Sequence, residues 1–195
     1  QSGLVEGADL PFLYYITTPA AQSAPHYVMT RHLHHGSTFV INKGVWDKLT
    51  PDEQAELLES ERVAIVTTNG PRGWPHSMPL WYVVRDGELW SWTYAKSQKV
   101  KNLERDPRAT LLVETGFEYT ELRGVQIEAE AELIRDPDEV FEFAKELTVR
   151  YAEGIDSVEG DAATALRAQA PKRVTIHFHP VRVATWDHRK LGGTY

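Results

Sequence analysis

Three polar residues, Ser97, Lys99 and Lys101, stand together where a strand pattern gives way to a helix pattern. The preceding residues, 88–93, alternate and are rich in Trp and Thr, which is typical of a half-buried strand. Ser97 occupies the N-cap position, where its hydroxyl can accept a hydrogen bond from a first-turn N–H. Because the free N–H groups of a helix start attract anions and both lysines add charge, we predict a phosphate site. The alternative is a capped surface helix with two solvated lysines.

Composition restricts the chemistry that the chain can support. Its 195 residues, 42% hydrophobic and 25% charged, suit one domain with a sizeable core. The formal charge of −7 leaves no basic field for nucleic acid. The absence of cysteine excludes disulfides, thiol catalysis and zinc–thiolate sites, and it favours the cytoplasm. We find no membrane-spanning apolar run or signal-peptide pattern, so we expect a soluble protein without a membrane partner.

The chain divides near residue 47 into two unequal parts. Residues 1–46 form an N-terminal extension of uncertain structure, in which residues 37–42 alternate weakly like a strand. The sequence becomes more regular at Thr50, where an N-cap, Pro51 and the capping-box residue Glu53 predict a helix that ends near residue 60. Residues 47–195 are therefore assigned to one domain.

Short strands with tight turns dominate this domain. We predict strands over 62–69, 75–84, 88–93, 109–114, 125–134, 172–179 and 181–186. Helices are predicted after Ser97, over 138–151 and over 162–170, with Pro180 interrupting the two last strands. Six or seven closely spaced antiparallel strands with few helices indicate a small barrel, because closure removes exposed strand edges.

Several motifs, in order and with short gaps, resemble the pyridoxamine 5'-phosphate oxidase-like superfamily. These motifs are Gly73–Tyr82, Asp86-Gly87, Trp92-Thr93, Ser97–Leu103, Asp106–Arg108, Leu122–Val125 and Val183–Gly193. Within the superfamily, the chain is most similar to the flavin- and deazaflavin-dependent oxidoreductases that use coenzyme F420. The resemblance implies a mainly β (α+β) fold, namely an FMN-binding type split β-barrel with peripheral helices. It also implies a homodimer with a cofactor groove between the subunits.

The same resemblance implies which residues bind the cofactor. One strand would line the flavin or deazaflavin ring and its ribityl chain, and the next segment would take the phosphate. The candidate cofactor-binding residues are Ser77, Met78, Pro79, Leu80, Trp81, Tyr82, Trp92, Thr93, Ser97, Gln98, Lys99, Lys101, Asn102 and Trp186. Lys99 is the residue on which the resemblance and the independent anion-site argument agree.

Departures from the superfamily pattern bear on the identity of the cofactor. Pyridoxamine phosphate oxidases proper have basic residues where this chain has Ser77 and Tyr82, and an arginine where it has Gln98. The phosphate of FMN carries nearly two charges, whereas the phosphodiester of F420 carries one, so the weaker clamp fits F420 better. FMN remains the alternative cofactor, and the vitamin B6 oxidase reaction is disfavoured.

The expected activity is hydride transfer between the bound cofactor and a small organic acceptor. His76, Tyr82 and His188 are candidate proton donors, and Trp81, Trp92, Trp186 and Tyr119 could form a flat apolar pocket. Further cations for the F420 tail are Arg72, Lys96 and Lys101. A second hypothesis is a non-catalytic protein that binds a flavin, haem or another tetrapyrrole in the same groove, and a third is a purely structural dimeric barrel with an empty groove.

Two remaining features are interpreted as structural. His26, His32, His34 and His35 cluster in the sequence, but no carboxylate stands at a spacing that would complete a metal site, so we expect no metal. Residues 4–46 lie outside the resemblance, and their aromatic residues favour packing over disorder. We expect this extension to wrap around the partner subunit or to cover the cofactor cleft.

Overall fold

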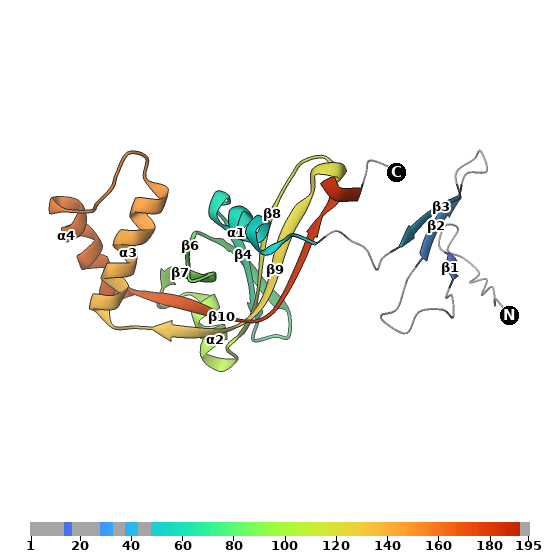
Figure 1. Ribbon diagram of the computed structural model, residues 1–195. Coiled ribbons are helices and arrows are strands. Elements are labelled where there is room, and N and C mark those ends of the chain that lie inside the picture. The colour runs from blue at the N-terminus through green and yellow to red at the C-terminus, as the bar shows by residue number, and fades with distance from the viewer. Residues whose placement is uncertain (1–13, 17–27, 33–37, 43–47, 192–195) are drawn as a thin grey trace.

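The computed structural model describes residues 14–16, 28–32, 38–42 and 48–191 of the chain (Figure 1). Its main body is an antiparallel sheet in the order β5-β4-β8-β9-β10-β7-β6. The strands are β4 (Ala64–Asn69), β5 (Pro75–Leu80), β6 (Tyr82–Arg85), β7 (Glu88–Tyr94), β8 (Arg108–Thr115), β9 (Arg123–Ile134) and β10 (Arg173–Asp187). The helices are α1 (Pro51–Ser60), α2 (Gln98–Arg105), α3 (Pro137–Tyr151) and α4 (Gly160–Gln169), with short 3-10 turns at Tyr119–Glu121, Ala170–Lys172 and His188–Leu191. The mainly β architecture with peripheral helices is as predicted.

The predicted single strand over 75–84 is wrong, because the chain changes partners at Trp81. The last pair of β5 joins Leu80 to Ala64, the first residue of β4, so no partner remains beyond it. From Tyr82 onward the chain pairs with β7 instead. Since β5 and β6 are the two edges of the sheet, one short run of residues serves both edges and curls the sheet into a barrel-like shape.

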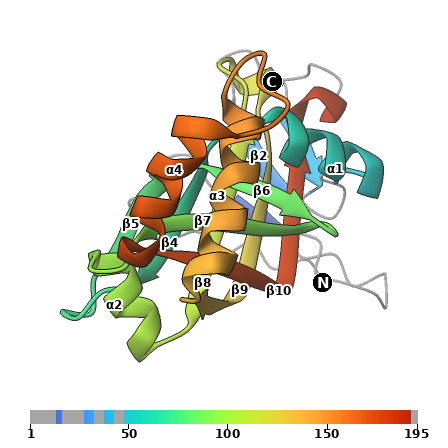
Figure 2. The same ribbon diagram turned by 90° about the vertical axis from the view of Figure 1, so that its left-hand side faces the viewer.

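The core lies inside this curl and is built by alternation along the strands. Leu89, Ile176 and Phe178 are each about 1% exposed or less, whereas their neighbours in sequence face outward. Helix α1 covers part of the interior with Leu57 and Leu58, and its predicted capping box is present, since Thr50 Oγ1 accepts from Glu53 N–H. The outer side of β6 and β7 is covered by α3 through Phe143 and its neighbours (Figure 2).

The last two predicted strands form one strand, β10, with an irregularity at Pro180. The register against β9 shifts by one residue between Pro180 and Arg182. Beyond the shift, Trp186 lies opposite Gly124, and a Cβ added at Gly124 would come within 2.3 Å of the indole ring. The close approach of this ring to the β9 backbone therefore requires glycine at position 124.

A second sheet belongs to the N-terminal extension. Its three strands, β1 (Tyr14–Ile16), β2 (Val28–His32) and β3 (Thr38–Asn42), are antiparallel in chain order. The predicted strand at 37–42 corresponds to β3. His26, His34 and His35 lie outside the described residues. Among the described helices, none combines the length and the apolar content that crossing a bilayer requires.

We predict that Gly124→Ala lowers the free energy of unfolding by about 1–3 kcal/mol, because the added methyl group clashes with the Trp186 ring. Urea denaturation of the full chain measures the change. In a Trp186→Leu background the same substitution should cost much less, since the ring is gone. Equal costs in the two backgrounds would show that the Trp186 ring does not impose the glycine.

Candidate functional site

The start of α2 places a lysine in an unusual environment. Lys99 is only 8% exposed, and its Nζ donates a hydrogen bond to Thr93 Oγ1 at 3.2 Å. Thr93 comes from β7, so the contact joins the strand and the helix that the sequence places next to each other. Desolvation lowers the pKa of Lys99 below its ordinary value. Among the ion pairs of the described residues, none involves Lys99, so no acidic side chain compensates its buried charge.

The Ser97 hydroxyl does not cap α2 as the sequence predicted. Ser97 is the N-cap residue and has extended backbone angles, but its side chain accepts no hydrogen bond from the first turn. Its Oγ is buried and has no hydrogen-bond partner among the described residues. A buried hydroxyl without a partner costs free energy. Ser97 is therefore available to donate to an external acceptor beside the helix N-terminus.

A chain of side-chain hydrogen bonds connects α2 to β4 and β5. Gln98 Nε2 donates to Asn102 Oδ1 at 2.8 Å, and Asn102 Nδ2 donates to Thr68 Oγ1 at 3.0 Å. The Thr68 hydroxyl lies 3.4 Å from the backbone oxygen of His76. Asn102 is fully buried, so this network fixes the helix against the strand that carries Ser77 and Met78.

Gln98 and His76 also share a cleft. This cleft has a volume of about 260 Å³ and is lined by Gly70, Pro71, Arg72, Trp74, Pro75, His76 and Gln98. The Nδ1 atom of His76 is buried and has no partner among the described residues. A larger cleft of about 440 Å³ lies over β4, β8 and β9, but it contains none of the predicted site residues. The smaller cleft is the one that adjoins the anion-site residues.

The strand predicted to line the cofactor ring is an edge strand with an exposed surface. Ser77 shares a hydrogen bond of 2.8 Å with Thr67, while Met78 and Pro79 face solvent and Leu80 is half-buried. Trp81, which follows the strand, is 56% exposed and stacks on Tyr151 with ring centroids 4.4 Å apart. Exposed apolar side chains on an edge strand form a surface that a flat ligand or another chain can cover.

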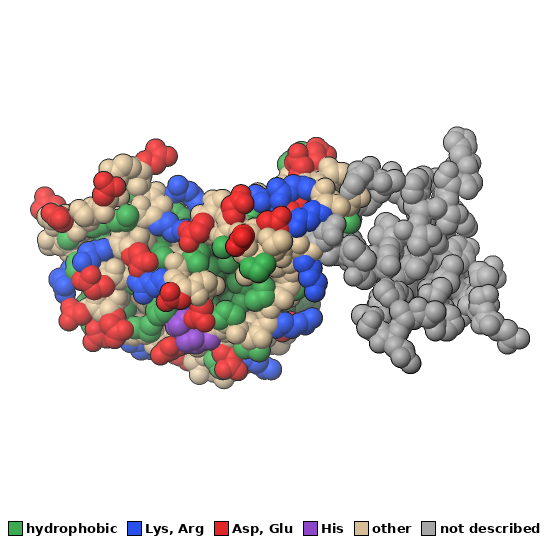
Figure 3. Space-filling view, in the orientation of Figure 1, with side chains coloured by type: hydrophobic (Ala, Val, Ile, Leu, Met, Phe, Trp, Pro, Cys, Tyr) green, Lys and Arg blue, Asp and Glu red, His purple; other side chains and the backbone are tan. Residues whose placement is uncertain are grey.

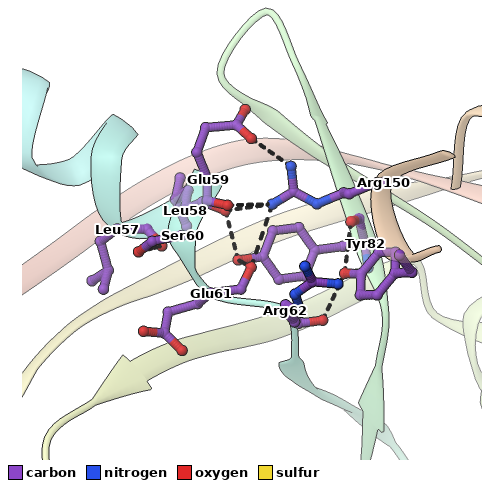
Figure 4. A network of polar contacts seen from close by, with 9 residues as sticks. Leu57, Leu58, Glu59, Ser60, Glu61, Arg62, Tyr82 and Arg150 are labelled. Atoms are coloured by element: carbon purple, nitrogen blue, oxygen red, sulfur yellow. Dashed lines mark hydrogen bonds and ion pairs between the residues drawn. The ribbon is translucent and has the colours of Figure 1, made fainter. Parts of the chain in front are cut away.

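Tyr82 occupies a different environment from its neighbours on the strand. Its hydroxyl lies 2.7 Å from the backbone oxygen of Leu58 and 3.0 Å from that of Glu61, beneath the end of α1 (Figure 4). Burial raises the pKa of Tyr82 far above its ordinary value. With its ring 1% exposed, the phenol has a structural role here, and the surroundings do not support proton donation to a substrate.

Sequence reasoning missed the two residues that hold this region together. Arg150 reaches from α3 to the backbone oxygens of Leu58, Glu59 and Glu61 and pairs with the Glu59 carboxylate (Figure 4). Tyr151 accepts a hydrogen bond from Tyr82 N–H at 2.9 Å, and its hydroxyl lies 2.6 Å from the backbone oxygen of Arg62. Nothing in a helical pattern marks these side chains, because their partners are backbone groups remote in sequence.

Some candidates lie apart from the Lys99 region. Trp92 points outward from β7, packs against α3 and lies under the Arg173 guanidinium at 4.4 Å. Trp186 covers Gly124. The His188 ring packs against Tyr119, and its Nδ1 lies 2.8 Å from the backbone oxygen of Tyr119. The cations Lys96, Lys101 and Arg72 are exposed. Within one chain, the structure brings together Thr93, Ser97, Gln98, Lys99, Asn102 and His76.

These residues fit a ligand that bears a phosphate. Three features favour an anion: the helix N-terminus, the buried Lys99 ammonium group and the buried Ser97 hydroxyl, of which the latter two lack a carboxylate partner and any hydrogen-bond partner, respectively, within the described ranges. The adjoining edge strand offers exposed apolar side chains beside it. Fold and site together define a barrel-like antiparallel sheet with a candidate anion site at the start of α2.

Comparison with known proteins gives the family. The sequence model of pyridoxamine 5'-phosphate oxidase matches residues 50–187, most of the chain, so the protein belongs to that family and has its split β-barrel fold. A second match, to the bacterial extracellular solute-binding proteins of family 7, covers residues 1–68, less than half of the chain. No curated protein matches the chain in sequence.

Solved structures agree with this assignment. A conserved hypothetical protein from Mycobacterium tuberculosis, Rv2991, is 37% identical, with a TM-score of 0.68 over 75% of this chain and 90% of its own. An F420 reductase is 21% identical, with a TM-score of 0.54 over 69% and 98%. The haem storage protein HutZ from Vibrio cholerae is 13% identical, with a TM-score of 0.55 over 70% and 94%. The last two likenesses show the shared fold alone.

We predict that Tyr151→Phe lowers the free energy of unfolding by about 1–3 kcal/mol, because the buried Tyr82 N–H loses its acceptor. Guanidinium denaturation measures the loss. Tyr94→Phe is the matched control, since the Tyr94 ring is 57% exposed, and it should change stability by less than about 0.5 kcal/mol. Similar effects of both substitutions would contradict the structural role given to Tyr151.

We also predict that Lys99→Met stabilises the protein in the absence of ligand. Because burial lowers the pKa of Lys99 from an ordinary value of 10.5, the unfolded chain binds more protons between the lowered pKa and 10.5. The buried charge of Lys99 therefore lowers the free energy of unfolding by its full amount below the lowered pKa. This destabilisation decreases as pH rises toward 10.5. At pH 7 the melting temperature of Lys99→Met should be higher by on the order of 2–4 °C.

The increase in melting temperature caused by Lys99→Met should become smaller as pH rises above the lowered pKa. Thermal melts of both proteins from pH 7 to 10 in phosphate-free buffer measure this dependence. Lys145→Met is the control, because Lys145 lies on α3 and pairs with Glu142, and it should give no gain. A lower melting temperature for Lys99→Met would show that the lysine contributes net stability without an anion.

Proposed function

We propose that the protein is a cytoplasmic, homodimeric oxidoreductase that transfers a hydride between bound F420, or FMN, and a small organic acceptor. The observation that carries the proposal is the buried Lys99 ammonium group, which has no acidic partner in the described part of the chain. Keeping such a charge buried is unfavourable unless something compensates it. A phosphate group on a cofactor provides that compensation.

The number of cations at the site favours F420 over FMN. Lys99 is the one buried cation among the anion-site residues, and Gln98 stands where related oxidases carry an arginine. One ammonium group, a hydroxyl and the helix N-terminus balance a singly charged phosphodiester better than a phosphate with nearly two charges. Lys101 is exposed and adds charge only at the edge of this region.

The protein's own contribution is to bind, orient and exclude water. Lys99, Ser97 and Gln98 would hold the phosphate, and Asn102 keeps α2 in place through Thr68. The exposed edge of β5, from Ser77 to Leu80, would lie along the ring and its ribityl chain. When bound, the cofactor supplies the hydride chemistry, which no side chain of this protein can perform.

The acceptor would lie against apolar side chains near the end of β5. Met78 and Trp81 are both exposed there, and a partner subunit and residues 1–46 would complete the pocket. Of the three candidate proton donors, His76 is favoured, because it lines the cleft beside Gln98 while the Tyr82 hydroxyl is buried under α1. His188 contacts Tyr119, apart from the Lys99 region. It remains a candidate proton donor only if dimerisation brings it to the site of the other subunit.

Titration of the purified protein with F420 and, separately, FMN tests the proposal through fluorescence quenching. We expect F420 to bind more tightly than FMN. Lys99→Met should weaken the binding of F420 by at least about ten-fold, because a charge-assisted contact with the phosphate is lost. Lys145→Met should bind like the wild type. Oxidation of reduced F420 should then be measured with quinones, enones and biliverdin as acceptors.

The outcomes separate the candidate functions. Tighter binding of FMN, with turnover, would assign a flavin oxidoreductase. Binding of F420 or FMN without turnover of any acceptor would favour a carrier role. Failure to bind either cofactor would overturn the proposal, and a haem titration would then test the non-catalytic alternative.

A further inference from the structure

Two histidines and two glutamates meet on the outer face of the sheet, away from the proposed anion site. Val174, Ile176 and Phe178 of β10 point into the core, so the alternate residues His177 and His179 point outward. Their neighbours come from the strands on either side. Glu132 of β9 stands opposite His177 in the register, and Glu88 is the first residue of β7.

Three of the four side chains converge closely enough to share one ion, and the fourth, Glu132, contacts the two histidines from the other side. His179 Nε2 lies 3.1 Å from Glu132 Oε2, and His177 Nδ1 lies 3.8 Å from the same oxygen. On the other side, His177 Nε2 contacts Glu88 Oε2, and His179 Nδ1 lies 3.8 Å from that oxygen. One ligand atom each from Glu88, His177 and His179 all lie within 4.8 Å of one another.

These separations suit a small divalent cation. In tetrahedral coordination, metal bonds of about 2.0–2.2 Å place ligand atoms roughly 3.3–3.6 Å apart, so modest rotations of the side chains would bring the ligand atoms to these separations. One ligand is already held in position, because the His177 ring stacks on Trp90 with centroids 3.7 Å apart. A fixed imidazole lowers the conformational entropy that binding must overcome.

The charge of the cluster also favours a divalent cation. Among the described residues, the ion pairs of Glu88 and Glu132 are all with His177 and His179. The nearby Arg85, which lies over the Trp90 ring, is already paired with Glu146. With neutral imidazoles the four side chains carry two negative charges, which one divalent cation would balance.

We propose that Glu88, His177 and His179 form a binding site for a divalent transition-metal ion of the zinc class, with Glu132 beside the other ring nitrogen of each histidine, where it would orient the imidazoles. Imidazole nitrogen with carboxylate oxygen is the ligand set that such ions prefer, whereas Mg²⁺ and Ca²⁺ prefer oxygen alone. The side chains of His179 and Glu132 are 47% and 59% exposed, so the ion can enter from solvent and retain a water ligand. Figure 3 shows histidine side chains on the surface beside acidic ones.

The ion would join two neighbouring strands from outside the barrel. Its ligands come from β7 and β10, and Glu132 of the adjoining strand β9 would support the two histidines. None of the four residues belongs to the candidate cofactor site, so metal binding is independent of the proposed hydride transfer. Loss of the metal should therefore change stability without abolishing the binding of F420.

Titration of the full-length, EDTA-treated and desalted protein with Co²⁺ tests the site, with visible absorption as the readout and Zn²⁺ as the competitor. We expect one Co²⁺ to bind with an absorption band that Zn²⁺ abolishes. His177→Gln/His179→Gln should weaken Co²⁺ at least about ten-fold. Glu132→Gln, at an exposed position that folding should tolerate, should also weaken it. Glu128→Gln is the matched control on the same strand, because Glu128 pairs with Arg182 instead.

The N-terminal histidines require a separate control. A full-length variant with His26, His32, His34 and His35 all replaced by Gln should keep the Co²⁺ band. Loss of the band in that variant would overturn the proposal. The proposal would also be overturned if the Glu132→Gln variant and the His177→Gln/His179→Gln double variant both bound Co²⁺ with an affinity within two-fold of the wild type. Absence of any Co²⁺ band in the wild type would also overturn it and leave an ordinary network of ion pairs.

Discussion

The fold depends on the point at which the chain passes from one edge of the sheet to the other. At Trp81 the backbone leaves the β5–β4 ladder and enters the β6–β7 ladder, so its polar groups need other partners. The Ser91 hydroxyl donates to the Trp81 backbone oxygen at 2.6 Å, and Tyr151 receives the Tyr82 N–H. These bonds come from β7 and α3, so both edges are fixed together. The position of β5 beside α2, and hence the candidate site, follows from this crossing.

Lys99 differs from two partly buried arginines of the same body, Arg150 and Arg85, because both of these have acidic partners. Arg150 pairs with Glu59 and three backbone oxygens, and Arg85 pairs with Glu146. Lys99 is more buried than either, yet among the described residues its side chain bonds to the neutral hydroxyl of Thr93 alone. No described acidic side chain pairs with this ammonium group, and the proposed phosphate would supply the missing compensation.

Sequence patterns predicted the structure well where neighbouring residues determine it. The features that the patterns failed to predict depend on contacts between residues remote in sequence. The capping box at Thr50 and the strand-to-helix step before Lys99 are set by neighbours in sequence, so both were predictable. The break at Trp81 was missed because its cause is the end of β4, which no local pattern reveals. The family resemblance predicted the fold, which the structure confirms, and a set of candidate cofactor-binding residues, which stays a prediction. The cluster of Glu88, His177 and His179 was missed because Glu88 and His177 are far apart in sequence and meet only through the register of β7 and β10.

The irregularity in β10 reconciles two demands on one strand. On the regular strand β9, Gly124 and Glu132 are an even number of residues apart and face the same way. Their partners on β10, Trp186 and His177, are an odd number apart, which a regular strand would place on opposite faces. The register shift between Pro180 and Arg182 adds the one residue that corrects the phase. Pro180 has no N–H to donate to a neighbouring strand, so an irregularity at this position loses fewer hydrogen bonds than elsewhere in β10. A single irregular position thus allows the same strand to present His177 to Glu132 and Trp186 to Gly124.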